Sequence, residues 1–489
     1  MKKTATFIFT AIMLVAVSFM AHAQNEEVTL ITNVNIFDGE NEKLLEGYDI
    51  LVVKNLIKKI DKDIKIADSY EIDVKTGGLK EMPGAHAHDL QGSGDKVVVV
   101  YEPEKEIKKE VKVKVIDGQG RTLIPGLIDN HWHTMMNFWP VSKVLNADIG
   151  YLSLAAAVYS KETLLRGYTT VRDVGGPSFG VHKAIETGFI VGPRMFVSGP
   201  YISQSSGHGD FRGPLDVPTN PGEPLSYNAR TGFTLIADGV PAVMMRTREA
   251  LRLGATQVKA MAGGGVSSLY DPLDVTEYTF EEAKAICDVA ATWNTYVAIH
   301  ANTDEAIHMW VEAGAKSVEH GFFISDETAK LMAEKGVWWS MQAMDAYGED
   351  AFEFENPISS AKYIECVSGL ESAMAACKKY NVKIAWGTDM LFDPVLAAKQ
   401  GKFLAKMQKW FTPYEVLKMA THDNAELVEM CGPRNPYQEG ELGVIKEGAY
   451  ADLIVVEGNP LEDIDLVADP ENNFKVIMKD GKVYKNTLK

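Results

Sequence analysis

Hydrophobic and polar positions follow one pattern at the two ends of the chain and another in its middle. From about residue 28 to 115, short apolar runs such as Tyr48–Val53 alternate with polar turns. The same pattern returns late in the chain, where Ala451–Val456 and Lys475–Met478 are strand candidates and Asp480-Gly481 forms a hairpin turn. Short apolar runs between turns predict β-strands. We therefore expect one small β-domain that is built from both ends.

The middle of the chain alternates strand-like and helix-like segments. The strand candidates are Thr122–Asp129, Thr169–Asp173, Arg194–Ser198, Gln257–Met261, Tyr296–His300, Ser317–Glu319, Val337–Ser340 and Lys383–Trp386. The amphipathic helix candidates between them include Leu152–Arg166, Phe280–Trp293, Asp304–Ala313, Asp326–Glu334 and Tyr363–Lys379. This succession over roughly 300 residues is typical of a (β/α)₈ barrel. A doubly wound open sheet is the alternative, but it usually has a glycine-rich phosphate loop after its first strand, and Gly126–Asp129 is not one.

These patterns predict an α/β protein with two domains. We place a (β/α)₈ TIM barrel at residues 122–436 and a small β-sandwich domain at residues 24–121 and 437–489. A stretch at about 75–110 is rich in Gly, Pro and His, and we interpret it as an insertion in the small domain. It contains His86-Ala87-His88, but no strand leads into this pair, so we expect incidental metal affinity at most.

The first 23 residues differ from the rest of the chain. Lys2 and Lys3 precede the apolar run Phe7–Met20, and Ala21-His22-Ala23 fits the small residues that a signal peptidase requires. We expect a signal peptide at residues 1–23 and an exported protein, periplasmic or secreted. The alternative is an uncleaved membrane anchor, but the apolar run is short for a membrane span.

Composition narrows the classes of partner. The net charge of -18 argues against nucleic-acid binding, which needs a basic surface. No later segment is long and apolar enough to predict a membrane span, so we expect no membrane contact after signal cleavage, while a homo-oligomer stays open. The four cysteines lack zinc-finger spacing, and we expect them to be free and buried: Cys287, Cys366, Cys377 and Cys431.

The sharpest chemical signal is Asp129-Asn130-His131-Trp132-His133. Side chains alternate along a strand, so His131 and His133 face the same way, about 7 Å apart along it. Neutral imidazoles are good metal ligands. The pair follows the first predicted barrel strand, and barrel active sites form at the C-terminal ends of the strands.

Later strands also end in residues that can bind a metal or be modified to do so. Lys259 precedes a glycine-rich loop, His300 and His320 end two strands, and Asp389 follows the last one. Any one of these has a structural explanation, such as capping the next helix. Together, in this order, they indicate a metal site.

These motifs resemble the amidohydrolase superfamily, in particular its imidazolonepropionase-like and Xaa-Pro dipeptidase-like branch. The resemblance covers nearly the whole chain after residue 23 and rests on Leu123–His133, Gly167–Asp173, His300, Glu319–Gly321, Gly387–Asp389 and Gly448–Val455. It implies a hydrolase of amide or peptide bonds with two divalent metal ions. His131, His133 and Asp389 would hold the more buried ion. His300 and His320 would hold the second, and Lys259 would bridge both as an N-carboxylate.

General chemistry agrees with this implied mechanism. Zinc is the default metal for a histidine-rich site, with manganese as an alternative. A water molecule between two cations loses its proton near neutral pH and becomes the nucleophile. Asp389 could accept that proton and pass it to the leaving amine.

The same resemblance assigns His208, in Gly207-His208-Gly209, to the scissile carbonyl, although a surface-loop histidine is an equally good interpretation. Tyr270 and Tyr227 are candidates for the substrate pocket, with exposed loop positions as the alternative. Arg172 and Asp173 are expected to form a structural pair at the barrel rim.

One position departs from the peptidase-like pattern. Asn302 stands where those members often have a tyrosine that contacts substrate. This departure argues against a plain dipeptidase and leaves the substrate class open. The leading hypothesis is hydrolysis of an amide or peptide bond in a small molecule, with a dipeptidase of the Xaa-Pro type or for a C-terminal residue as the first candidate. The alternatives are a cyclic amide hydrolase or a deaminase, some with a single metal, and a non-catalytic binding barrel. The presence of all six candidate ligands argues against the last.

Overall fold

The computed structural model describes residues 28–65, 69–73, 78–81, 88–89, 96–102, 107–213, 215–219, 223–268, 270–354 and 356–488. The predicted signal peptide and His86 lie outside the described residues. Two compact units emerge, one with residues 67–113 and the first 28 residues, the other with residues 29–66 and 114–489. In the first unit, β7 (Lys96–Glu102) pairs with β4 (Ser69–Asp73), β6 (His88–Asp89) and the start of β8 (Ile107–Pro125), and β4 pairs with β5 (Gly78–Glu81).

The second unit contains a sheet that joins strands from both ends of the chain. Its order is β21-β20-β19-β8-β1-β2-β3. The bounds are β1 Val28–Ile36, β2 Leu45–Val53, β3 Leu56–Asp61, β19 Leu453–Val456, β20 Phe474–Lys479 and β21 Lys482–Asn486. The last residues of β8, Thr122–Pro125, run antiparallel to β19. Alternate residues of these strands, such as Val34, Ile50 and Leu453, fill a common core.

The middle of the chain forms two parallel sheets. The first has the order β11-β10-β9, with β9 at Leu127–Trp132, β10 at Tyr168–Asp173 and β11 at Arg194–Val197. The second has the order β13-β12-β14-β15-β16-β17-β18. Its strands are β12 Tyr201–Ser203, β13 Thr234–Ile236, β14 Val258–Met261, β15 Val297–Ala301, β16 Ser317–His320, β17 Trp338–Met341 and β18 Lys383–Trp386. Parallel strands with intervening helices confirm the α/β class.

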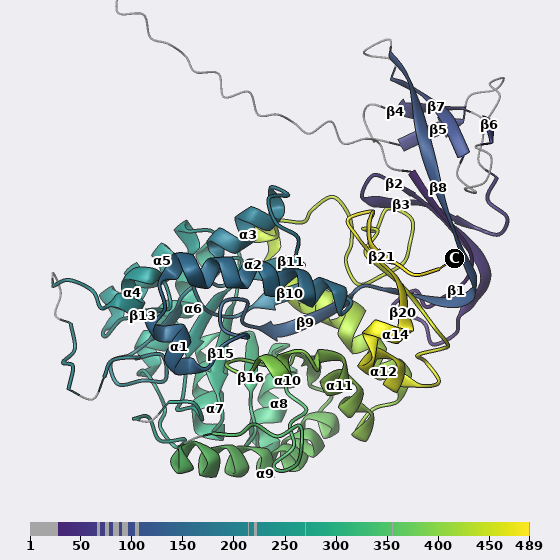
Figure 1. The fold of residues 1–489 in the computed structure, drawn as a ribbon. Coiled ribbons are helices and arrows are strands. Elements are labelled where there is room, and N and C mark those ends of the chain that lie inside the picture. The colour runs from purple at the N-terminus through teal and green to yellow at the C-terminus, as the bar shows by residue number, and fades with distance from the viewer. Residues whose placement is uncertain are drawn as a thin grey trace, which may run out of the picture. The chain divides into compact units, whose positions relative to one another are not determined.

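Helices follow most of these strands. Their bounds are α1 Val141–Asn146, α2 Ile149–Leu165, α3 Phe179–Glu186, α4 Tyr227–Thr231, α5 Val240–Arg252, α6 Phe280–Thr292, α7 Asp304–Ala313, α8 Asp326–Lys335 and α9 Pro357–Lys379. Shorter helices come later: α10 Pro394–Ala397, α11 Gln400–Ala405, η1 Lys406–Lys409, α12 Pro413–Lys418, η2 Met419–Asp423, α13 Asn424–Glu429, η3 Gly432–Arg434, η4 Ile464–Ala468 and α14 Pro470–Asn473. Helices α5 to α9 pack side by side in chain order (Figure 1). Side-chain caps fix the starts of α6, α8 and α9, for example the reciprocal pair of Thr279 and Glu282 at α6.

The first predicted barrel strand needs a correction. Thr122–Asp129 is not one strand, because Thr122–Pro125 belongs to the terminal sheet and β9 begins at Leu127. Gly126 separates the two, and a Cβ atom there would lie 2.0 Å from the Oγ1 atom of Thr169. The sequence patterns also did not predict β12, β13 or α5. The other seven predicted barrel strands lie within one residue of the observed bounds.

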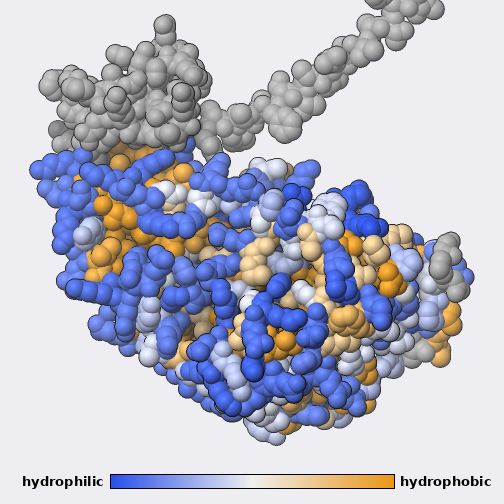
Figure 2. All heavy atoms as spheres, turned by 180° about the vertical axis from the view of Figure 1, so that it is seen from behind, coloured by the Kyte–Doolittle hydropathy of each residue, from blue (hydrophilic) through white to orange (hydrophobic). Residues whose placement is uncertain are grey.

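Charged and polar residues dominate the face of the molecule in Figure 2, and hydrophobic residues form smaller patches between them. Most of the large apolar side chains pack inside, with Trp132, Trp310, Trp339 and Trp386 fully buried, whereas others such as Phe189 are exposed. In the described part of the chain, no helix is both long and apolar enough to cross a membrane. All four cysteines are free and buried, as predicted.

Candidate metal centre

The C-terminal ends of the parallel strands bring the predicted ligands together. His131 lies near the end of β9 and His133 directly after it, while His300 and His320 lie at the ends of β15 and β16. Asp389 follows β18, and its backbone N–H donates to the carbonyl oxygen of His131 at 2.8 Å. All four histidines are at least 93% buried. Residues from widely separated parts of the sequence thus meet at one edge of the sheets.

Three histidines surround the carboxylate of Asp389. The Nε2 atoms of His131 and His133 both lie 3.2 Å from its Oδ1 atom, and the Nδ1 atom of His320 lies 3.8 Å from Oδ2. His300 extends the cluster, with its ring centre 4.4 Å from that of His320. The ligand atoms of His131, His320 and Asp389 are close enough to share one metal ion.

The hydrogen bonds of the two β9 histidines direct lone pairs into this cluster. The Nδ1 atom of His131 lies 2.8 Å from Glu319 Oε2, and that of His133 lies 3.1 Å from the carbonyl oxygen of Gly175. Because both partners only accept, each neutral ring carries its proton on Nδ1 and a lone pair on Nε2. Two lone pairs therefore face Asp389 Oδ1, which has no hydrogen-bond partner among the described residues. A cation fits this arrangement, since acceptors alone repel one another.

Lys259, on β14, is buried, and its Nζ atom has no hydrogen-bond partner in the described part of the chain. Burial lowers the pKa of Lys259 to about 8, against the opposing charges of Glu319 and Asp389. A buried amine without a partner is costly. The Lys259 amine therefore suits a covalent modification, or a contact with a ligand that binds in the site.

Glu319 belongs to a motif of the resemblance but has no role in the sequence analysis. In the structure it lies beside the predicted ligand His131. Arg172 donates to its Oε1 atom at 2.7 Å and Ser317 at 2.6 Å, while Oε2 faces His131. Burial opposes its charge, but Arg172 and His131 hold the pKa of Glu319 well below its usual range. This ionised carboxylate orients His131 and increases its basicity.

The expected pair of Arg172 with Asp173 is wrong. Adjacent strand residues point to opposite faces of a sheet. Arg172 therefore contacts Glu319, while Asp173 accepts hydrogen bonds from the Thr134 backbone at 2.8 Å and from the Ser178 hydroxyl at 2.9 Å.

The structure also adds Gln342, which the sequence analysis missed. Its Oε1 atom lies 2.9 Å from the Nδ1 atom of His320, so it orients that ring. Burial lowers the pKa of His320 to about 3, which keeps the ring neutral at physiological pH. Only its place one residue after β17 could have pointed to it.

His208 joins the cluster, but the two tyrosine candidates do not. The ring of His208 stacks on that of His300, with centres 4.1 Å apart and planes at 18°. Tyr270 is 58% exposed, and Tyr227 lies on α4, where its hydroxyl donates to the carbonyl oxygen of Ala147 at 2.7 Å. The alternative of an exposed position is the better interpretation of Tyr270.

Comparison with known proteins identifies the family. Residues 122–485, which include every residue of the cluster, match the amidohydrolase family. The chain belongs to this family. The sequence of this amidohydrolase is 33% identical to ochratoxinase from Aspergillus niger over 408 residues, which cover 80% of this chain and 82% of the relative.

Solved structures agree with this assignment. A prolidase in complex with N-methylphosphonate-L-proline is 31% identical, with a TM-score of 0.78 over 94% of this chain and 100% of that one. The Aspergillus niger ochratoxinase structure is 27% identical, with a TM-score of 0.74 over 94% and 96% of the two chains. The protein is therefore a metal-dependent hydrolase that acts on carbon–nitrogen bonds of the amide or peptide type.

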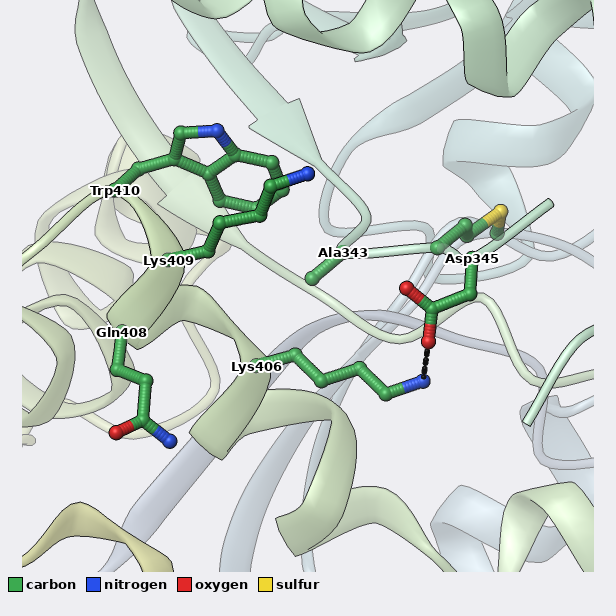
Figure 3. Close-up of a pocket in the computed structure, with 7 residues that line it drawn as sticks. Ala343, Asp345, Lys406, Gln408, Lys409 and Trp410 are labelled. Carbon is green, nitrogen blue, oxygen red and sulfur yellow. Dashed lines mark ion pairs between the residues drawn. The ribbon is translucent and has the colours of Figure 1, made fainter. Parts of the chain in front are cut away.

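A hollow in this amidohydrolase is lined by residues other than the predicted ligands. It encloses about 280 Å³ (Figure 3), and none of the six ligands lines it. Lys406 points across it to Asp345, with 2.6 Å between Nζ and Oδ2, and also lies 3.4 Å from Asp350. Lys409 also lines the hollow and pairs with Glu371. Because carboxylates neutralise both lysines, neither is an unpaired cation for an anionic ligand.

Proposed function

We propose that this amidohydrolase removes the C-terminal residue from small substrates, namely dipeptides of the Xaa-Pro type and N-acyl amino acids. The observation that carries the proposal is the cluster of histidine lone pairs around Asp389, beside the unpartnered amine of Lys259. The 31% identity to a prolidase that was solved with an N-methylphosphonate-L-proline ligand supports this substrate class.

We assign two divalent ions, with zinc as the expected metal, to the same residues as the resemblance implied. His131, His133 and Asp389 would hold one ion, and His300 and His320 the other. Bound there, such ions acidify water and polarise a carbonyl group. Histidine nitrogens with a carboxylate are the donors that zinc prefers.

Lys259 would complete the site as an N-carboxylate. With a pKa of about 8, a sizeable fraction of its amine is neutral near that pH and can add to CO₂. The new N–C bond forms as one proton leaves the nitrogen, and the product is an anionic carbamate with two oxygens. Such a group suits a bridging role, whereas an ammonium group has no lone pair to offer.

Asp389, at the centre of the histidine cluster, would carry the proton from the attacking water to the leaving amine. Burial opposes its charge, but His131 and His133 hold its pKa well below the usual range, so it is a carboxylate before the reaction. It can accept a proton from the attacking water and donate it to the leaving amine. The ring of His208, at the outer side of His300, would bind the scissile carbonyl oxygen.

Asn302 replaces the tyrosine that contacts substrate in many peptidase-like members, and its surroundings indicate a structural role. It is 2% exposed, and its Nδ2 atom donates to the carbonyl oxygen of Gly264 at 3.0 Å. Because this amide supports the loop after β14, we propose that other residues contact the substrate.

We further propose that the two parallel sheets together form the (β/α)₈ barrel. Bonds outside the strand ladders bridge both gaps between them. The Nδ2 atom of Asn424 donates to the carbonyl oxygens of Ile128 on β9 and Trp386 on β18, at 2.7 and 2.8 Å. At the other gap, the Thr256 N–H donates to the carbonyl oxygen of Val197, at the end of β11, at 2.8 Å.

The test combines metal analysis with a substrate panel. We expect two metal equivalents per chain and hydrolysis of Xaa-Pro dipeptides or N-acyl amino acids, but not of cyclic ureides. Lys259→Ala should lower the metal content and abolish turnover. One equivalent per chain, unchanged in Lys259→Ala, would contradict the two-metal site. Hydrolysis of cyclic ureides alone would contradict the substrate class.

Export remains a separate proposal, because the relevant residues are not described. N-terminal sequencing of the protein from its native host should show a chain that begins at Gln24. A retained Met1 or Lys2 would refute cleavage.

A further inference from the structure

The loop between β14 and α6 is fastened by a lysine from a distant helix. Lys362, on α9, donates from Nζ to the carbonyl oxygens of Gly265 at 2.9 Å, Ser268 at 3.0 Å and Asp271 at 2.7 Å. An ammonium group has three N–H donors, so one loop occupies all of them. Lys362 is only 9% exposed, and a buried cation held by three carbonyls is an expensive anchor for an ordinary surface loop.

The loop between β14 and α6 places the carboxylate of Asp271 next to the ring of His208. The Oδ2 atom of Asp271 accepts from the Gly265 backbone at 2.8 Å and the Ser268 hydroxyl at 2.6 Å, and it lies 3.2 Å from His208 Nδ1. Burial opposes its charge, but the hydrogen bond and charge of His208 lower the pKa of Asp271, so it is ionised. The Ser268 hydroxyl, which donates its own proton to Asp271, lies closer to His208 Nδ1, at 2.6 Å, and can only accept there. Asp271 therefore places the imidazole proton on Nδ1 both through its own contact and through Ser268.

The remaining sides of the His208 ring are also fixed. One face stacks on His300, and a Cβ atom at Gly265 would lie 2.0 Å from His208 Cε1, so only glycine allows this close approach. The backbone N–H of His208 donates to Glu277 Oε1 at 2.5 Å. Within the described chain, Nε2 has no hydrogen-bond partner, so one edge of the ring is available for substrate.

We propose that Lys362 and Asp271 are positioning residues for His208. Lys362 holds the loop, the loop holds Asp271, and Asp271 fixes the tautomer and orientation of the imidazole that binds the scissile carbonyl. This inference rests on the proposed function, because it explains how His208 is prepared for its role in that reaction. Neither residue touches substrate, and both act through the ring.

A double-mutant cycle on a substrate that the wild-type enzyme cleaves tests this dependence. Asp271→Asn should lower kcat by about 100-fold, as expected for a misplaced group, with little change in KM. In a His208→Ala background, the same substitution should cost little more, because its effect passes through the missing ring. Lys362→Met should act in the same direction. Lys379→Met, which removes an exposed lysine from the same helix, should leave kcat unchanged.

Crystal structures of the metal-loaded wild type, Asp271→Asn and Lys362→Met provide a readout that does not need turnover. We expect the His208 ring to rotate or shift by about 1 Å or more in both variants, a displacement that costs catalysis, with the metal content unchanged. A ring that stays in place, or an Asp271→Asn loss of equal size in both backgrounds, would overturn the proposal. If Lys362→Met does not fold, Asp271→Asn decides alone. If no dipeptide or N-acyl amino acid is cleaved, the proposed substrate class fails, while the structures still decide the positioning.

Discussion

Replacement of Glu319 by glutamine would test how strongly a residue behind the ligands controls the site. The substitution keeps the size of the side chain and removes its charge. Arg172, which is fully buried, then keeps its bonds to the carbonyl oxygen of Asn130 at 2.6 Å and to Ser317 at 3.1 Å, but loses its ion pair with a carboxylate. Breaking a buried pair from one side costs about 3–5 kcal/mol. Because Arg172 keeps these neutral acceptors, we expect the free energy of unfolding to fall by the lower limit of this range, about 3 kcal/mol.

The same substitution should weaken metal binding. A glutamine side chain presents either an oxygen or an NH₂ group to His131, and the second choice forces the ring proton onto Nε2, where the metal would bind. Loss of such a partner typically costs 10- to 100-fold in metal affinity or activity, or about 1.4–2.7 kcal/mol. Urea unfolding of the metal-free protein measures the first effect, and zinc titration against a chelator measures the second.

Two controls separate this explanation from a general loss of stability. Glu249→Gln makes the same chemical change in an exposed pair with Arg252, where solvent screens the charges, and should change stability far less than Glu319→Gln does. Arg172→Met combined with Glu319→Gln leaves no unpaired charge, so the double variant should lose less stability than the sum of the single ones. A Glu319→Gln protein within about 0.5 kcal/mol of wild type, with unchanged zinc affinity, would refute the reasoning.

Two further predictions concern Asp389 and Glu277. Asp389→Asn keeps an oxygen ligand but cannot carry a proton. Metal analysis should therefore show that most of the metal stays bound, while steady-state kinetics should show that kcat falls by about 10²–10⁴-fold. Turnover near that of the wild type would exclude Asp389 as the proton carrier. Burial raises the pKa of Glu277 from 4.5 to about 8, so the folded state holds a proton that the unfolded state releases, and stability falls as pH rises between these values. Glu277→Gln has no proton to lose, so its Tm relative to wild type should increase from pH 4.5 to pH 8, and a constant difference across that range would contradict the assignment.

The sequence predicted most of the parallel strands correctly and selected residues that the structure brings together, because both depend on local patterns. Buried parallel strands are continuous apolar runs, and His131, His300 and His320 follow such runs directly. Parallel strands place their C-terminal ends at the same edge of a sheet, so residues that follow them come together whatever the length of the loops. The predicted ligands around Asp389 could therefore be chosen without coordinates.

The supporting residues could not be predicted in the same way. Lys362 and Gln342 lie far in the sequence from the residues that they hold, and neither has a local motif. The pairing of Arg172 was misjudged because the adjacent Asp173 suggested a partner, although the strand directs the two side chains to opposite faces. Contacts of this kind depend on tertiary packing, which periodicity does not encode.

The short break at Gly126 also affects the order in which the protein can assemble. On one side of it, β8 needs β19 as its neighbour, and on the other side β9 carries His131. A nascent chain emerges from the ribosome N-terminus first, so the edge of β8 that pairs with β19 stays unpaired until more than 300 further residues have been made, although its neighbour β1 is already present. Until then its edge is open to wrong pairing. Completion of the terminal sheet, which one residue separates from the strand that carries His131, is thus a late event in synthesis, and we expect metal uptake at the proposed site to be late as well.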